Sequence, residues 1–139
     1  VDAFSEKEEF HYYDETVIDQ KVVLWKDRMV EICTLGNNNF FETYVILQPI
    51  LGSGQRSPVG IDEKYHYDSW NIQQTLIDYE KYAKELSDLD IICDETYDLR
   101  GGLDGISEPL FLDYVHVNEI ADDIISKKLF EIIMNNLSK

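Results

Sequence analysis

Three long amphipathic segments alternate with only two short strand-like runs, and this imbalance constrains the fold more than any other feature. The first segment follows Asp14, a residue suited to cap a helix, and approaches Gly36, a residue suited to end one. Similar apolar spacing over residues 69–87 and from Asn118 onward predicts two further helices, with Asn118 as the cap of the last one. The apolar positions of the first segment step by four and three, which predicts one buried face: Ile18, Val22, Trp25, Met29 and Ile32.

Two short apolar runs lie between these helices. Residues 43–49 read Thr-Tyr-Val-Ile-Leu-Gln-Pro and end at a proline, and residues 89–93 supply the second run. A continuous apolar run is typical of a strand buried on both faces, as in parallel sheets. The alternating order therefore predicts an α/β fold, a three-layer α/β/α doubly wound parallel sheet, within one domain over residues 1–139. The two strands would be parallel and joined by a right-handed crossover through the helix over residues 69–87.

Two strands are too few for such a sheet. Parallel sheets of this kind usually contain about four to six strands, and three helices with apolar faces need a wider surface to cover. We therefore expect the sheet to lack its N-terminal strands, which an N-terminal fragment or a second copy of the chain would supply. A weakly marked strand at residues 9–13 is the alternative.

Charge and cysteine content restrict the partners. The 28 acidic and 12 basic residues give a formal net charge of -16, which repels nucleic acid and anionic lipid. No apolar run approaches the roughly 20 residues that span a bilayer, so we expect no nucleic-acid partner and no membrane span. Cys33 and Cys93 have no Cys-x-x-Cys spacing, so we expect buried thiols rather than a zinc site or a disulfide, and no cofactor or metal. The cellular compartment stays open.

The segment with the clearest chemistry covers residues 111–121, which read Phe-Leu-Asp-Tyr-Val-His-Val-Asn-Glu-Ile-Ala. An Asp three residues before a His, in a turn leading into a helix, can accept a hydrogen bond from the imidazole Nδ1–H. Nε2 is then free to take a proton from a nucleophile. Asp113 and His116 are therefore candidate catalytic residues, and a simple helix-capping pair is the alternative reading.

This segment resembles the last conserved block of the SGNH/GDSL hydrolases, in which Asp-x-x-His-x-Asn precedes an Ile- and Ala-rich terminal helix. The order of predicted elements, with a long loop over residues 51–68, resembles the second half of that fold. The resemblance implies the C-terminal part of a serine esterase or acetyl-ester hydrolase, with His116 as general base and Asp113 fixing its tautomer. The implied substrate is an ester or an O-acetylated small molecule or carbohydrate.

The serine nucleophile of that family has no counterpart here. The Gly-Asp-Ser motif is absent. The Gly-Asn-Asn-Asn run over residues 36–39 superficially resembles the family's Gly-x-Asn-Asp motif, which supplies an oxyanion-hole residue, but it is better explained as the end of a helix. Ser53 lies between two glycines after a strand but lacks the Gly-x-Ser-x-Gly frame of a nucleophile elbow. The resemblance therefore implies that the serine belongs to an N-terminal fragment or a second copy, and that the isolated chain is inactive.

A second function remains open. The alternative is a non-catalytic binding or interaction module that keeps half of such a fold. Its nine tyrosines would suit carbohydrate recognition.

Overall fold

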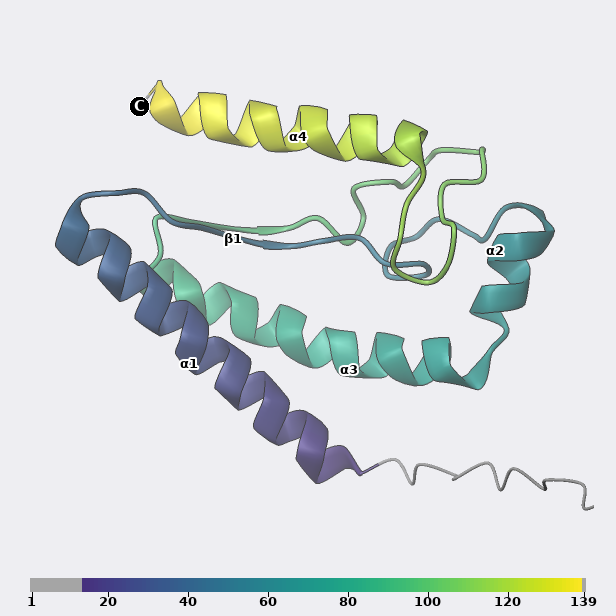
Figure 1. Cartoon of the computed structure of the whole chain (residues 1–139), viewed down its shortest axis with the longest axis horizontal. Coiled ribbons are helices and arrows are strands. Elements are labelled where there is room, and N and C mark those ends of the chain that lie inside the picture. The colour runs from purple at the N-terminus through teal and green to yellow at the C-terminus, as the bar shows by residue number, and fades with distance from the viewer. Residues whose placement is uncertain (1–13, 139) are drawn as a thin grey trace, which may run out of the picture.

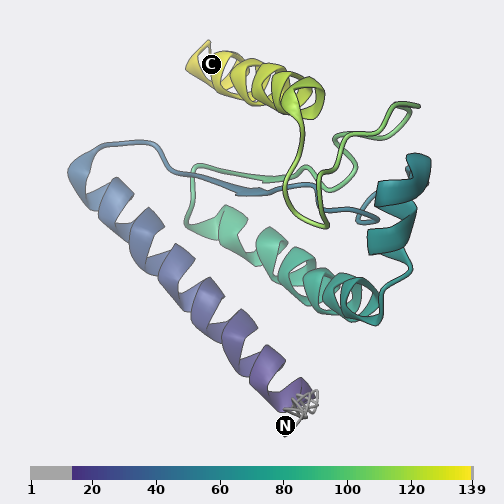
Figure 2. The same ribbon diagram turned by 45° about the vertical axis from the view of Figure 1, so that its right-hand side comes forward.

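The computed structural model describes residues 14–138, without the side chain of Trp70. Figure 1 shows α4 on one side of a short strand pair and α1 and α3 on the other, and Figure 2 shows the same separation after rotation. Helical residues make up 59% of the described chain. The elements in order are α1 (Glu15–Asn39), β1 (Tyr44–Leu47), α2 (Gly60–Tyr67), α3 (Trp70–Leu86), the 3-10 helix η1 (Ser87–Ile91), β2 (Glu95–Asp98) and α4 (Glu119–Leu137).

The predicted three-layer doubly wound sheet is wrong. The described residues are mostly helical, and their sheet has only two strands, β1 and β2, of four residues each. The strands are parallel, as expected, with Tyr44 opposite Glu95 and Leu47 opposite Asp98. Long helices dominate because most of the apolar residues recur with a period near 3.6. Some of these side chains in α1 and α3 pack against each other. The alternative strand at residues 9–13 lies outside the described residues.

The second strand is not where the apolar run predicted it. Residues 89–93 form the end of η1 and a turn, in which the N–H groups of Ile92 and Cys93 both donate to the Leu89 carbonyl. The strand instead follows at Glu95–Asp98, outside both apolar runs. Periodicity alone cannot separate a short buried strand from a buried helical turn, and Leu89 is fully buried here through helical geometry.

The N-terminus of α1 follows the prediction, whereas its C-terminus does not. The Asp14 side chain accepts a hydrogen bond from the Thr16 N–H at 2.9 Å. The helix continues past Gly36, and Phe40 adopts the left-handed conformation (φ 61°) that ends it. Gly36 serves a different purpose, since a Cβ there would lie 2.6 Å from the Thr43 methyl group. The glycine allows the chain leading into β1 to pass close to the helix.

Two apolar clusters hold the molecule together. The first lies between α1, α3 and β1 and contains Cys33, Val45, Leu47, Leu86, Leu89 and Cys93. The second lies beneath the segment that leads into α4 and contains Leu51, Leu103, Leu110, Phe111 and Ala121. The second cluster therefore supports the segment that carries Asp113 and His116.

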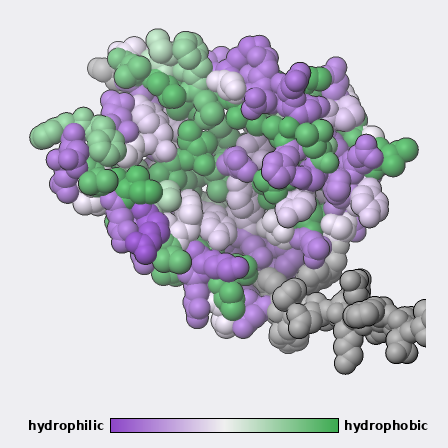
Figure 3. Space-filling view, viewed as in Figure 1, coloured by the Kyte–Doolittle hydropathy of each residue, from purple (hydrophilic) through white to green (hydrophobic). Residues whose placement is uncertain are grey.

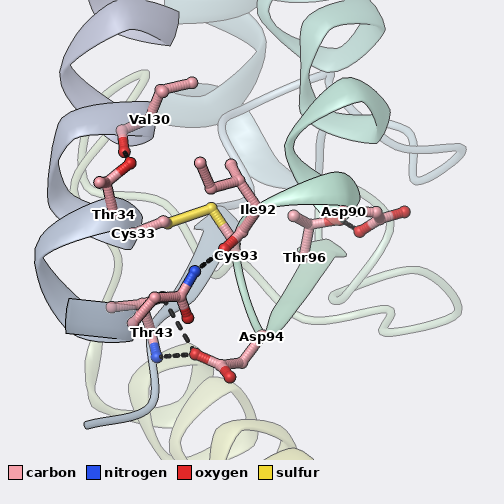
Figure 4. Close-up of a disulfide and its surroundings, with 10 residues drawn as sticks. Val30, Cys33, Thr34, Thr43, Asp90, Ile92, Cys93, Asp94 and Thr96 are labelled. Atoms are coloured by element: carbon pink, nitrogen blue, oxygen red, sulfur yellow. Dashed lines mark hydrogen bonds between the residues drawn. A yellow bond between two sulfur atoms is a disulfide. The ribbon is translucent and has the colours of Figure 1, made fainter. Parts of the chain in front are cut away.

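The expectation of two buried thiols is wrong, because Cys33 and Cys93 form a disulfide with a Cα–Cα distance of 4.9 Å (Figure 4). Beside it, the Asp94 carboxylate accepts a hydrogen bond of 2.7 Å from the Thr43 N–H, which joins the starts of both strands. The two cysteines are 60 residues apart in sequence, so only tertiary packing brings them together. Disulfides of this kind are typical of proteins that fold in an oxidising compartment.

Large apolar side chains remain exposed on the two outer helices. Figure 3 shows hydrophobic atoms gathered over the C-terminal half of α4 and just beneath it. Within residues 14–138, no helix combines the length and the apolar character needed to cross a bilayer. The exposed apolar residues of α4 are Ile120, Phe130, Ile133, Met134 and Leu137, and those of α1 are Val17, Val23, Leu24, Ile32 and Leu35.

Candidate active site

Asp113 and His116 lie in a tight loop immediately before α4. An isolated antiparallel bridge between Phe111 and Val117 closes the base of this loop, and the Leu112 N–H donates to the His116 carbonyl at 2.8 Å. The loop then runs into α4 at Asn118, whose side chain caps the helix by accepting from the Ala121 N–H at 3.1 Å. The cap expected at Asn118 is therefore confirmed.

The two side chains meet as the three-residue spacing suggested. Asp113 Oδ2 lies 2.7 Å from His116 Nδ1, and Asp113 Oδ1 accepts from the N–H groups of Val115 and His116, both at 2.7 Å. The imidazole is 78% exposed and the carboxylate 37%. The carboxylate thus fixes both the turn and the ring, while Nε2 is accessible to solvent. The catalytic role of the pair stays a prediction.

The same contacts keep Asp113 ionised. The His116 N–H, the His116 ring and the Val115 N–H all favour the carboxylate, and they hold the pKa of Asp113 well below its usual value. An ionised Asp113 can only accept hydrogen bonds, so a neutral imidazole beside it must carry its proton on Nδ1. Its Nε2 then presents a lone pair, which is the state that a general base requires.

No nucleophile accompanies this pair in the described chain. Among residues 14–138, no hydroxyl group makes a hydrogen bond with the His116 ring. The Ser53 hydroxyl donates to the Arg100 carbonyl and accepts from the Ile50 N–H, so it stabilises a turn. Asn37, in the run that superficially resembles an oxyanion-hole motif, donates its amide to the Ile92 carbonyl. Each of these two side chains has a structural role.

A buried ion pair beneath the loop was missed by the sequence analysis. Arg56 and Glu63 form a bidentate pair with N···O distances of 2.9 and 3.1 Å, and their side chains are only 7% and 1% exposed. Both lie in the stretch over residues 51–68 that was predicted to be a loop, although α2 occupies its last part. An arginine and a glutamate seven residues apart give no recognisable signal in a single sequence.

A hollow of about 380 Å³ separates α2 from the base of the loop. Exposed Ile61 and Leu112 stand at its walls, and His66 and Asn118 add polar groups. Neither Asp113 nor His116 lines this hollow. It borders the loop without containing the candidate catalytic atoms.

Acidic side chains near the two strands have protein partners. Asp98 pairs with Arg100 at 2.8 Å, and Asp104 Oδ1 accepts from the N–H groups of Gln55 and Arg56. Within the described part of the chain, no group of three or more His, Cys, Asp or Glu side chains is arranged to hold a metal ion. These carboxylates therefore organise loops.

Comparison with known proteins supplies no relative. No family model matches the sequence, and neither the curated proteins nor the solved structures contain a match.

Proposed function

We propose that this chain contributes the Asp-His part of a Ser-His-Asp ester hydrolase, with His116 as general base and Asp113 as its orienting carboxylate. The observation that carries the proposal is the 2.7 Å contact between Asp113 Oδ2 and His116 Nδ1, combined with the 78% exposure of the imidazole. A simple capping pair needs only the bonds from Asp113 to the backbone. The additional bond to Nδ1 fixes the ring with Nε2 facing outward, which capping does not require.

The reaction follows from this arrangement. His116 Nε2 takes the proton from a serine hydroxyl as the serine oxygen attacks the carbonyl carbon of an ester. The imidazolium, stabilised by ionised Asp113, then gives that proton to the departing alcohol oxygen, and an acyl-enzyme remains. His116 then takes a proton from the water that attacks the acyl carbon, and it gives this proton to the serine oxygen as the bond to the acyl group breaks and the carboxylic acid leaves. The proposed substrate is an ester or an O-acetylated small molecule or carbohydrate.

The serine and the oxyanion-hole donors would come from a second polypeptide surface, either an N-terminal serine-bearing fragment or a second copy of the chain. The apolar side chains exposed on α4, including Phe130, Met134 and Leu137, support such an association. Exposed apolar patches of this kind commonly mark surfaces that bind another polypeptide. In addition, one edge of β1 has no strand partner among residues 14–138.

The proposal is tested with the complete reading frame that encodes this chain, together with any polypeptide that co-purifies with it. A fluorophosphonate probe should label an active serine, and p-nitrophenyl acetate should be hydrolysed. His116→Ala should abolish both, and Asp113→Asn should lower kcat by roughly 10³–10⁴-fold, as expected for loss of the orienting carboxylate. Asp123→Asn on α4 is the matched control, because Asp123 pairs with Lys127 on the surface. Full hydrolysis after His116→Ala, or hydrolysis by the isolated chain independent of His116, would refute the proposal.

A non-catalytic binding module is the second candidate, and one observation favours it. A hollow of about 410 Å³ lies against β1 and is lined by aromatic side chains: Trp25, Tyr44, Tyr79 and Tyr82. Aromatic faces suit the stacking of sugar rings. If this function is the real one, Trp25→Ala should weaken oligosaccharide binding measured by calorimetry, whereas His116→Ala should not change it.

A further inference from the structure

The Arg56–Glu63 pair is connected to the candidate catalytic loop by a complete set of hydrogen bonds. Glu63 Oε1 accepts from the N–H groups of Leu110 and Phe111 at 2.6 and 2.9 Å, in addition to its bond from Arg56. Glu63 Oε2 accepts from Arg56 and from the Val59 N–H at 2.6 Å. The buried carboxylate therefore has five donors, and two of them belong to the segment immediately before the loop.

Arg56 binds the same segment at two further points. Its Nε donates to the Ile106 carbonyl at 3.0 Å, and its Nη2 donates to the Glu108 carbonyl. The guanidinium carbon also lies 6.0 Å from the centre of the Phe111 ring. Arg56 and Glu63 together thus fix the backbone of residues 106–111 at several points, through charged side chains that are almost completely buried.

This fixed segment leads directly to the catalytic pair. Phe111 is bridged to Val117, and the Asn118 N–H donates to the Leu110 carbonyl at 2.8 Å. Asn118 Nδ2 also donates to the Pro109 carbonyl at 2.8 Å. The two ends of the loop are therefore joined through Leu110 and Phe111, whose N–H groups bind Glu63. Asp113 and His116 lie in the exposed part between these ends, where a hydrogen bond from the Leu51 N–H to the Tyr114 carbonyl at 3.0 Å ties the loop to another part of the chain.

We infer that Arg56 and Glu63 are positioning residues, which hold the loop over residues 112–116 in the conformation that keeps the Nδ1–H of His116 on Asp113. Neither residue contacts the imidazole, so the effect passes through the backbone of Leu110 and Phe111. We call Arg56 and Glu63 together the clamp. Its role in catalysis rests on the proposed function, whereas its effect on the imidazole does not.

The test measures the tautomer of His116 by ¹⁵N NMR of the intact chain, at a pH where the ring is neutral. The wild-type chain should show the Nδ1–H form, and Asp113→Ala defines the ratio of tautomers without the acceptor carboxylate. Glu63→Gln keeps the shape of the side chain but replaces an acceptor oxygen with a donor, so it should move the ratio at least halfway toward that of Asp113→Ala. Asp62→Asn, a neighbouring exposed acid on α2, is the matched control and should leave the ratio unchanged.

A second variant keeps the inference testable if Glu63→Gln does not fold. Arg56→Lys retains a positive charge beside Glu63 but cannot also reach the two carbonyls that Arg56 binds. It should therefore give a smaller shift of the same sign. A wild-type ratio in a folded Glu63→Gln chain, or in Arg56→Lys when that variant alone folds, would overturn the inference.

The activity assay separates this inference from the proposed function. In the hydrolytically active complex, Glu63→Gln should lower kcat with little change in KM, because the tautomer rather than substrate binding is affected. If Glu63→Gln changes the tautomer ratio of His116 but hydrolysis does not depend on His116, the inference about the clamp is supported and the proposed function is wrong. If hydrolysis depends on His116 but Glu63→Gln leaves the tautomer ratio unchanged, only the inference about the clamp is wrong.

Discussion

Cys33 in α1 is covalently joined to Cys93, which lies between η1 and β2. Both side chains are almost completely buried, at 0% and 6% exposure, within the cluster that also holds β1. The bond ties the longest helix to the start of the second strand. It therefore fixes the relative positions of elements that are otherwise joined by few direct contacts.

Removal of this disulfide should destabilise the chain strongly. For a separation of 60 residues, the loss of entropy in the unfolded chain corresponds to about 4 kcal/mol of stability. We expect Cys33→Ala/Cys93→Ala to lower the free energy of unfolding in urea by that order. Thiol titration of the denatured, unreduced protein should find no free cysteine. Equal stability of the variant and the oxidised wild type would contradict this prediction.

Stability should fall in acid, and Glu63 should contribute to the fall. Burial disfavours its charged form, but Arg56 and the N–H groups of Val59, Leu110 and Phe111 outweigh burial and hold the pKa of Glu63 below its usual 4.5. The stabilisation is therefore complete above pH 4.5 and is lost as the pH falls through the lower pKa of the folded state. Urea titrations at several pH values should show a stability difference between wild type and Glu63→Gln that shrinks below that pH. A constant difference would argue against an ionised Glu63, and Asp62→Asn should show little difference at any pH.

Asn118 should contribute to stability through both of its side-chain contacts. Its oxygen caps α4 by accepting from Ala121, and its amide donates to the Pro109 carbonyl at the base of the loop. Asn118→Ala should cost about 1–2 kcal/mol, measured by chemical denaturation. Asn135→Ala, at an exposed position near the other end of α4, should change stability by less than about 0.5 kcal/mol.

Phe40 offers an opposite test, because its replacement should stabilise the chain. Its left-handed backbone (φ 61°) is unfavourable for a residue with a side chain, and its side chain is 97% exposed and so gains little from packing. Phe40→Gly should therefore raise the free energy of unfolding by up to about 1 kcal/mol. Phe40→Ala is the matched control, because it removes the ring without relieving the backbone. If Phe40→Gly lowers the free energy of unfolding and Phe40→Ala does not, the left-handed backbone at this position carries no energetic cost.

Much of the candidate site depends on local chemistry, and the sequence alone determined it. The caps at Asp14 and Asn118 act on N–H groups two or three residues away, and the contact between Asp113 and His116 spans three residues. Such contacts need only one turn of chain to form. For the same reason, the three long helices and β1 were predictable from periodicity and flanking residues.

Tertiary structure alone decided the rest. Three contacts join segments some 50 to 60 residues apart. They are the pairing of β2 with β1, the disulfide between Cys33 and Cys93, and the hydrogen bonds from Leu110 and Phe111 to Glu63. Composition and spacing do not specify such distant partners, because many alternative pairings have similar local cost. The apolar run at residues 89–93 forms a helical turn rather than a strand. This conformation buries Leu89 and joins Cys93 to α1 without any strand pairing. Among residues 14–138 the sheet has two strands, and its width is set by which distant backbone segments pair with each other and not by the number of apolar runs.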